Sequence, residues 1–119
     1  MTTENNKIIA EFMIKQEPTE NFCVGSIGQE VGVFTGIKTE YFKYEDLKFH
    51  SDWNWLMQVV EKIENLSKEG ETYMLSITKF SARVTYKGSR IVDLPIDNTK
   101  IEAVYNACVE FIKWYNENR

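Results

Sequence analysis

Residues 99–115, TKIEAVYNACVEFIKWY, carry the clearest structural signal in the chain. Thr99 and Glu102 form a T-x-x-E capping box, which is typical of the first turn of a helix. The apolar side chains beyond it recur at the three- and four-residue spacing of one helix face, at Ile101, Val104, Tyr105, Cys108, Phe111, Ile112 and Tyr115. The stretch therefore predicts a long C-terminal helix with one face packed against the rest of the fold.

Two further helices are predicted upstream. Residues 6–13 are expected to form a short amphipathic helix, and Pro18 ends any continuation of it. A longer helix is expected to begin at Ser51, its N-cap, and to end near Lys68, before Gly70. Its buried face is predicted to consist of Trp53, Leu56, Met57, Val60 and Ile63.

Strand signals lie between these helices. Glycines and valines are interleaved over residues 22–36, which favours two short strands joined by a tight turn at residues 26–29. Residues 41–49 mix aromatic and charged side chains, and they are expected to form a partly buried loop or an edge strand. Three runs of β-branched and aromatic residues predict an antiparallel meander over residues 73–94.

The order of these elements predicts an α+β fold, with residues 1–119 as a single domain. Its antiparallel sheet is expected to comprise the meander 73–94 and the weaker N-terminal strands. Two long amphipathic helices and the short N-terminal helix are expected to pack on this sheet. In the middle strand of the meander, Ala82 and Val84 should face the core and Arg83 should face outward.

The composition limits the functional classes. The chain has 119 residues, of which 43% are hydrophobic, and its net charge of −4 argues against general affinity for nucleic acid or anionic membranes. Cys23 and Cys108 are interpreted as free thiols in a reducing cytosol. No apolar run approaches the roughly 20 residues of a membrane span, and the N-terminus lacks the features of a signal peptide. We therefore expect a cytoplasmic protein with no membrane partner.

No residue pattern favours catalysis. His50, the only histidine, has no further ligands at metal-site spacing and is interpreted as a residue at the entrance of the second helix. A Cys–His pair is not favoured either, because Cys108 belongs to the predicted apolar stripe and Cys23 lacks an activating neighbour. The glycines match no phosphate-binding motif. The expectation is a protein that is not an enzyme and has no metal or cofactor.

A small basic surface is the first candidate site. Lys79, Arg83, Lys87 and Arg90 lie close together in an otherwise acidic chain. Lys79, Arg83 and Arg90 are suited to neutralising the phosphate of a small anionic, nucleotide-like ligand, and a nearby aromatic such as Tyr86 would stack on its base. The alternative is an ordinary solvated outer face of the sheet.

Two tryptophans mark a second candidate site. At about 100° per residue, Trp55 and Trp114 each lie roughly 110° from the centre of the main apolar stripe of their helix. Each has apolar companions on its flank: Val59 and Leu66 beside Trp55, and Ala103 and Ala107 beside Trp114. Either the two helices pack on each other as well as on the sheet, or one flank is an exposed interface for a partner or a second copy. The residues predicted for such an interface are Trp55, Val59 and Trp114.

Three stretches, NKIIAEFM (6–13), HSDWNWLMQVVEKIE (50–64) and IEAVYNACVEFIKWYN (101–116), resemble a family of small uncharacterised proteins of phages and prophages of Bacteroidota. The resemblance covers the predicted helices and implies a phage accessory product in the host cytosol. It brings no catalytic or ligand residues with it. By analogy, such proteins bind host factors or sequester nucleotide signals used in antiviral defence.

The leading hypothesis is a small non-enzymatic binding protein, with a homodimer as one expected form. Its partner would be a host protein or a small anionic ligand, captured stoichiometrically in an anti-defence role. Two alternatives stay open: a metal-dependent hydrolase or nuclease that uses scattered carboxylates, and a structural or assembly component of a virion.

Overall fold

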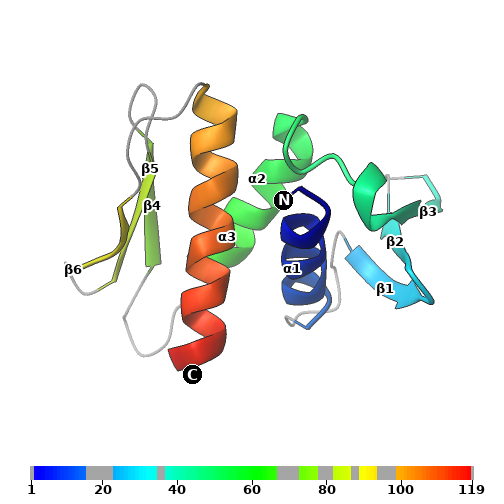
Figure 1. The fold of residues 1–119 in the computed structure, drawn as a ribbon, viewed down its shortest axis with the longest axis horizontal. Coiled ribbons are helices and arrows are strands. Elements are labelled where there is room, and N and C mark those ends of the chain that lie inside the picture. The colour runs from blue at the N-terminus through cyan, green and yellow to red at the C-terminus, as the bar shows by residue number, and fades with distance from the viewer. Residues whose placement is uncertain are drawn as a thin grey trace.

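The computed structural model describes residues 2–15, 23–34, 37–66, 73–77, 82–86, 89–93 and 99–118 (Figure 1). Its helices are α1 (Thr2–Lys15), α2 (Trp53–Glu64) and α3 (Lys100–Asn118), and a 3₁₀ turn, η1 (Tyr44–Asp46), precedes α2. Its strands are β1 (Cys23–Ile27), β2 (Glu30–Phe34), β3 (Thr39–Lys43), β4 (Tyr73–Ile77), β5 (Ala82–Tyr86) and β6 (Ser89–Asp93). The predicted α+β class is confirmed. The N-terminal helix is not short, however, because α1 has 14 residues and α2 has 12.

The described strands form two antiparallel sheets, in the orders β1-β2-β3 and β4-β5-β6, with the three helices between them (Figure 1). α1 contacts β1, α2 contacts β4, and α3 contacts β5 and β6. The expectation of one sheet that includes the N-terminal strands was wrong. Each set of strands instead covers a different side of the helices, which gives the helices apolar neighbours on two sides.

α3 is buried around most of its circumference. Ala103, Ala107 and Val109 lie outside the predicted stripe, yet none of the three is more than 2% exposed. The helix contacts α1 and α2 as well as the second sheet, so one apolar face would not suffice. Its predicted cap is confirmed, because the N–H of Glu102 donates a hydrogen bond to Thr99 Oγ1 at 3.2 Å.

The start and end of α2 differ from the prediction. The N-cap is Asp52 and not Ser51, because Asp52 Oδ1 accepts a hydrogen bond from the N–H of Asn54 at 2.8 Å. A carboxylate at this position also interacts favourably with the positive end of the helix dipole. The helix ends at Glu64, with Asn65 as its C-cap, and does not continue to Lys68.

The buried face of α2 is also rotated from the predicted one. Trp53 and Met57, expected inside, are 40% and 38% exposed, whereas Trp55 is buried. The Trp55 ring packs edge-on against Phe42 of β3 and against Phe49, at centroid distances of 5.3 and 5.4 Å. Both flanks of the helix are apolar, so periodicity alone does not decide which one faces inward. The contacts of Trp55 with Phe42 and Phe49 determine which flank of α2 is buried.

β1 and β2 form the predicted hairpin. Ile27 pairs with Glu30, which leaves Gly28 and Gln29 as a two-residue loop. Gly28 has a φ of 61°, in the left-handed region that tight hairpin turns require and that glycine adopts without strain. On β2, Val31 and Val33 are fully buried against the helical layer.

One fully buried polar side chain, Asn6 of α1, joins three parts of the fold. Asn6 Nδ2 donates hydrogen bonds to the carbonyl oxygens of Tyr44 and Leu47, at 2.9 and 3.2 Å. The Tyr105 hydroxyl on α3 donates to Asn6 Oδ1 at 2.9 Å. Both polar atoms of the Asn6 amide are therefore hydrogen-bonded, and these bonds hold α1 against the η1 segment and α3.

Candidate binding surface

The structure describes only part of the predicted basic surface. Lys79 and Lys87 lie outside the described residues, as do the side chains of Tyr86 and Arg90. Ala82 and Val84 are buried as predicted, and Arg83 is half-buried. Arg83 already interacts within the chain, and the strand register places it opposite Asp93, an acidic residue. An anion site here stays a prediction.

The predicted tryptophan interface is buried within the chain to different degrees. Trp55 is 9% exposed and Val59 is fully buried, so contact of a partner with these side chains would require the chain to open there. Trp114 is half-buried, and its ring lies 6.0 Å from Phe111 and 6.3 Å from Tyr73. Within the chain, the Trp55 ring packs against Phe42 of β3 and the Trp114 ring against Tyr73 of β4. An interface at the half-buried Trp114 stays a prediction.

The two thiols are buried, which opposes nucleophilic chemistry. Both cysteines are free, and desolvation raises the pKa of the Cys23 thiol to about 12. Desolvation, reinforced by the negative charge of Glu64, also raises the pKa of Cys108. A thiolate is the reactive form of cysteine, so neither side chain is prepared as a nucleophile.

His50 lies in the turn before α2, as predicted. Its ring packs against the Tyr105 ring, with the two centroids 6.0 Å apart. Within the described part of the chain, its buried Nδ1 has no hydrogen-bond partner. A general base needs a group that orients its imidazole, and the described residues do not provide one. They also contain no cluster of three or more potential metal ligands. None of the described helices has the length and apolar character needed to cross a membrane.

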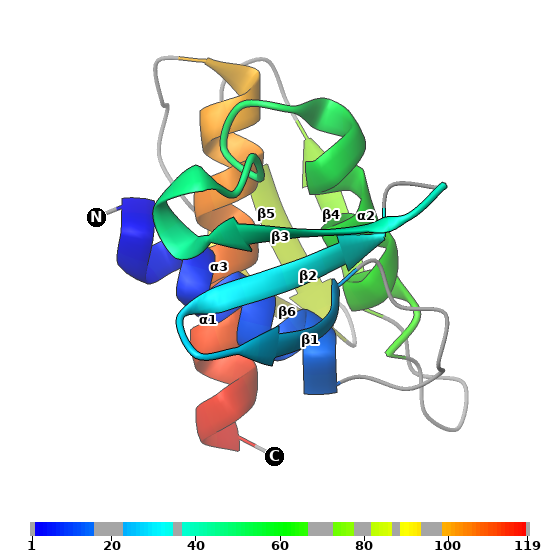
Figure 2. The ribbon, with the colours of Figure 1, turned by 90° about the vertical axis from the view of Figure 1, so that its right-hand side faces the viewer.

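The outer face of the β1-β2-β3 sheet is the most distinctive surface of the described residues. The strand register places three rows of side chains on it, because directly opposed residues share a face. We define the outer face by these rows: Ile27, Glu30 and Lys43; Gly25, Gly32 and Tyr41; Phe34 and Thr39. In Figure 2 the three strands lie in front of the helices, with this face toward the viewer.

Large apolar side chains are exposed on this face. Ile27 is 67% exposed, Phe34 46% and Tyr41 50%, and Ile37 just before β3 is 92% exposed. On the opposite face of the same strands, Val31 and Val33 are fully buried. Both faces of the sheet therefore carry apolar residues, whereas a sheet with one solvated face usually alternates apolar and polar residues.

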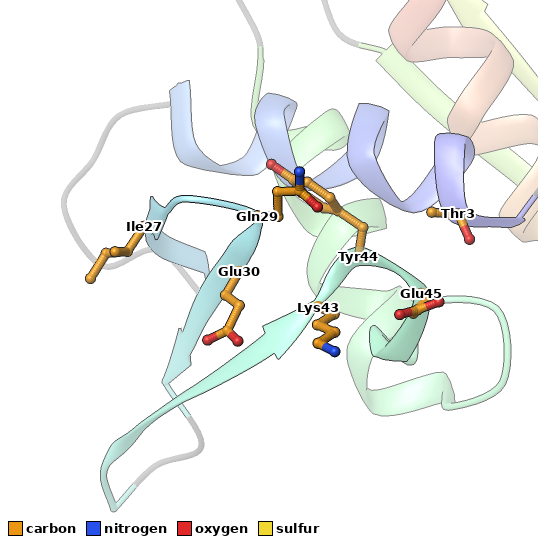
Figure 3. Close-up of a pocket in the computed structure, with 7 residues that line it drawn as sticks. All are labelled: Thr3, Ile27, Gln29, Glu30, Lys43, Tyr44 and Glu45. Atoms are coloured by element: carbon orange, nitrogen blue, oxygen red, sulfur yellow. The ribbon is translucent and has the colours of Figure 1, made fainter.

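A pocket of about 440 Å³ lies at the hairpin end of the sheet, beside the start of α1 (Figure 3). It is lined by Thr3, Ile27, Gln29, Glu30, Lys43, Tyr44 and Glu45. In Figure 3 the side chains of Glu30 and Lys43 extend away from α1, whereas Tyr44 extends toward it, where Lys7 Nζ lies 5.8 Å from its ring centroid. Charges of both signs line the pocket, so it selects neither a simple anion nor a simple cation.

This surface was not among the sites predicted from the sequence. The signal was present in the glycines of β1 and β2 and in the alternation of Thr39, Tyr41 and Lys43. Residues 41–49 were left open between a loop and an edge strand, so Tyr41 could not be assigned to a face. The register, which only the fold provides, brings it opposite Gly32.

Comparisons with protein-family models, curated proteins and solved structures found no match to the chain. The surface chemistry of the chain is therefore the basis for a functional assignment.

Proposed function

We propose that this chain is a non-enzymatic binding protein that contacts a protein partner through the outer face of the β1-β2-β3 sheet. One observation carries the proposal: Ile27, Phe34 and Tyr41 are exposed together on a face that no described element covers. Exposed apolar patches with charged neighbours are typical of interaction surfaces, and tyrosine and phenylalanine are favoured as anchors.

The shape of the face favours a protein over a small molecule. Small ligands bind in concave, mostly enclosed sites, whereas this face is a sheet surface with a mixed-charge pocket at one end. The described residues favour binding over catalysis, because both thiols are buried and His50 Nδ1 has no hydrogen-bond partner among them. Stoichiometric association needs neither a nucleophile nor a metal.

Site-specific photo-crosslinking tests the proposal. Tyr41 is replaced by p-benzoyl-phenylalanine, and a matched variant carries the same residue at Met74, which is 59% exposed on the other sheet. Each variant is irradiated in bacterial cell extract, the setting implied by the resemblance to phage proteins. A discrete covalent adduct with a protein is expected from position 41 and not from position 74. If position 41 gives no adduct, or if both positions give the same adducts, the outer face is not a specific protein-binding surface.

A further inference from the structure

Resting on the proposed function, we infer that the protein bound at the outer face is a second copy of this chain. The two copies would meet face to face, related by a two-fold axis that runs parallel to the strands between β2 and β3. Such an axis exchanges opposed positions of β2 and β3 between the copies. The register of these two strands therefore predicts which side chains meet.

Charge complementarity supports this arrangement. Glu30 and Lys43 are directly opposed across β2 and β3, and both are exposed. Within the described part of the chain, neither takes part in an ion pair. Under the two-fold axis each Glu30 faces Lys43 of the second copy, which creates two symmetric ion pairs at one end of the contact. Opposite charges placed in this way fix the register of an interface.

The middle of the face combines a large exposed ring with two glycines. Tyr41 is opposed by Gly32, and Gly32 by Gly25 on the next strand, so a row with no side chain lies beside an exposed ring. A Cβ added at Gly25 would meet no atom within 4 Å, so the space above Gly25 is open, whereas Gly32 is buried. The axis places the exposed Tyr41 ring of each copy against the middle of β2 in the other copy. At the far end of the contact, Phe34 meets Thr39.

The size of the face limits the affinity. With the axis between β2 and β3, only these two strands of each copy overlap, and a contact of five residues per strand spans roughly 10 by 17 Å. Such a contact is smaller than the roughly 800 Å² per partner of a standard interface. A weak, reversible dimer is therefore expected, visible by sedimentation velocity at about 100 µM and dissociated on dilution.

Paired charge reversals test the arrangement. Glu30→Lys alone places two lysine side chains against each other across the contact, and Lys43→Glu alone places two glutamates against each other. Each single variant should dimerise at least about tenfold more weakly than the wild type. When the two variants are mixed, a heterodimer again pairs opposite charges across the contact, and dimerisation should return. Repulsion within one chain is not relieved by mixing, so only contact between copies explains such a recovery.

Matched reversals elsewhere serve as controls. Glu11 and Lys48 are exposed and lie outside the outer face, so Glu11→Lys and Lys48→Glu should leave dimerisation unchanged. Circular dichroism confirms that each variant is folded. If the wild type stays monomeric at about 100 µM, or if mixing restores nothing, the inference is overturned.

The crosslinking experiment separates this inference from the proposed function. An adduct from position 41 with twice the mass of the chain, also formed by the purified protein alone, supports both. An adduct only with a different protein overturns the second copy as occupant and leaves the protein-binding face intact. The absence of any adduct overturns both.

Discussion

The two sheets share a plan and differ in what they leave exposed. Each has three antiparallel strands with one face on the helical layer. The outer face of the first sheet exposes Ile27, Phe34 and Tyr41 around a row of glycines. On the second sheet, the described outward positions of β4 and β5 hold Met74, Ser76, Arg83 and Thr85, a mixed and mostly polar set.

This difference separates residues that serve the fold from residues that serve another purpose. Burial in the core explains the apolar residues on the inner faces of both sheets. It does not explain three large apolar side chains in water on the outer face of the first sheet. Solvation normally favours polar residues at such positions, and three of the four described outward positions of β4 and β5 follow that rule. The exception on the first sheet is what favours a protein contact there.

The largest loss of stability is expected from truncating buried phenylalanines next to each sheet. These substitutions test whether the inner faces of both sheets belong to one core. Phe49 and Phe111 are fully buried, and their rings pack against Trp55 of α2 and Tyr73 of β4 respectively. Phe49→Ala and Phe111→Ala should each lower the free energy of unfolding by about 3–5 kcal/mol. Urea titrations followed by tryptophan fluorescence and by far-UV circular dichroism measure this.

The two probes should give coincident transitions for each variant, as expected of one cooperative domain. If Phe49→Ala melts the first sheet in a separate transition while the second sheet persists, the two sheets belong to distinct folding units. They would then not share one core.

A smaller loss is expected at the polar joint between the helices. Asn6→Ala removes the buried amide that pairs with the carbonyls of Tyr44 and Leu47 and with the Tyr105 hydroxyl. Tyr105 then keeps only a 3.4 Å hydrogen bond to the Thr2 carbonyl, and the Tyr44 carbonyl one of 3.4 Å from the Leu47 N–H. The free energy of unfolding should fall by about 2–3 kcal/mol. Asn5→Ala is the matched control, because Asn5 is the neighbouring residue on the same helix and is only partly buried. Equal effects of the two changes would contradict a specific role for the Asn6 amide.

Local signals predicted the elements, whereas long-range contacts decided their arrangement. Three features depend only on residues close in sequence, and all three are confirmed: the periodicity of α3, its Thr99 cap and the turn at Gly28. The buried flank of α2 depends on Phe42 and Phe49, which precede it in the chain and which no pattern within the helix can reveal. The division of six strands into two sheets is likewise a choice among pairings.

The candidate sites show the same limit. The basic surface was inferred from residues close in sequence, yet the register adds Asp93 opposite Arg83. Each tryptophan-bearing helix has a wider apolar arc than one sheet contact requires. The contacts of α3 with α1 and α2, and the packing of Trp55 on Phe42 of β3, supply the reason. The outer face was not predicted because its residues come from three strands and are not neighbours in the sequence. Only the pairing of β2 with β3 makes them neighbours.

A moderate pH effect is expected from the same polar joint. Burial raises the pKa of Tyr105 from 10.0 to about 12, so the folded state holds this proton after the unfolded state has released it. The contribution is fully present below pH 10 and is lost as the pH rises from about 10 to about 12. The stability advantage of the wild type over Tyr105→Phe should therefore shrink across this range. Urea titrations at about pH 8, 10 and 11 measure it, and a constant difference would contradict the assignment.

The smallest effect is expected on the outer faces, where it separates the two sheets most directly. Tyr41→Ser and Met74→Ser should each change the stability of the monomer by no more than about 0.5 kcal/mol, because both side chains are half exposed or more. Their behaviour on concentration should differ. Association that occurs only between folded chains raises the apparent stability as the protein concentration rises. The melting temperature should therefore rise with concentration for the wild type and for Met74→Ser, and stay constant for Tyr41→Ser. If all three proteins melt independently of concentration, the exposed ring of Tyr41 does not join copies of the chain, and the apolar outer face must be explained by a different partner.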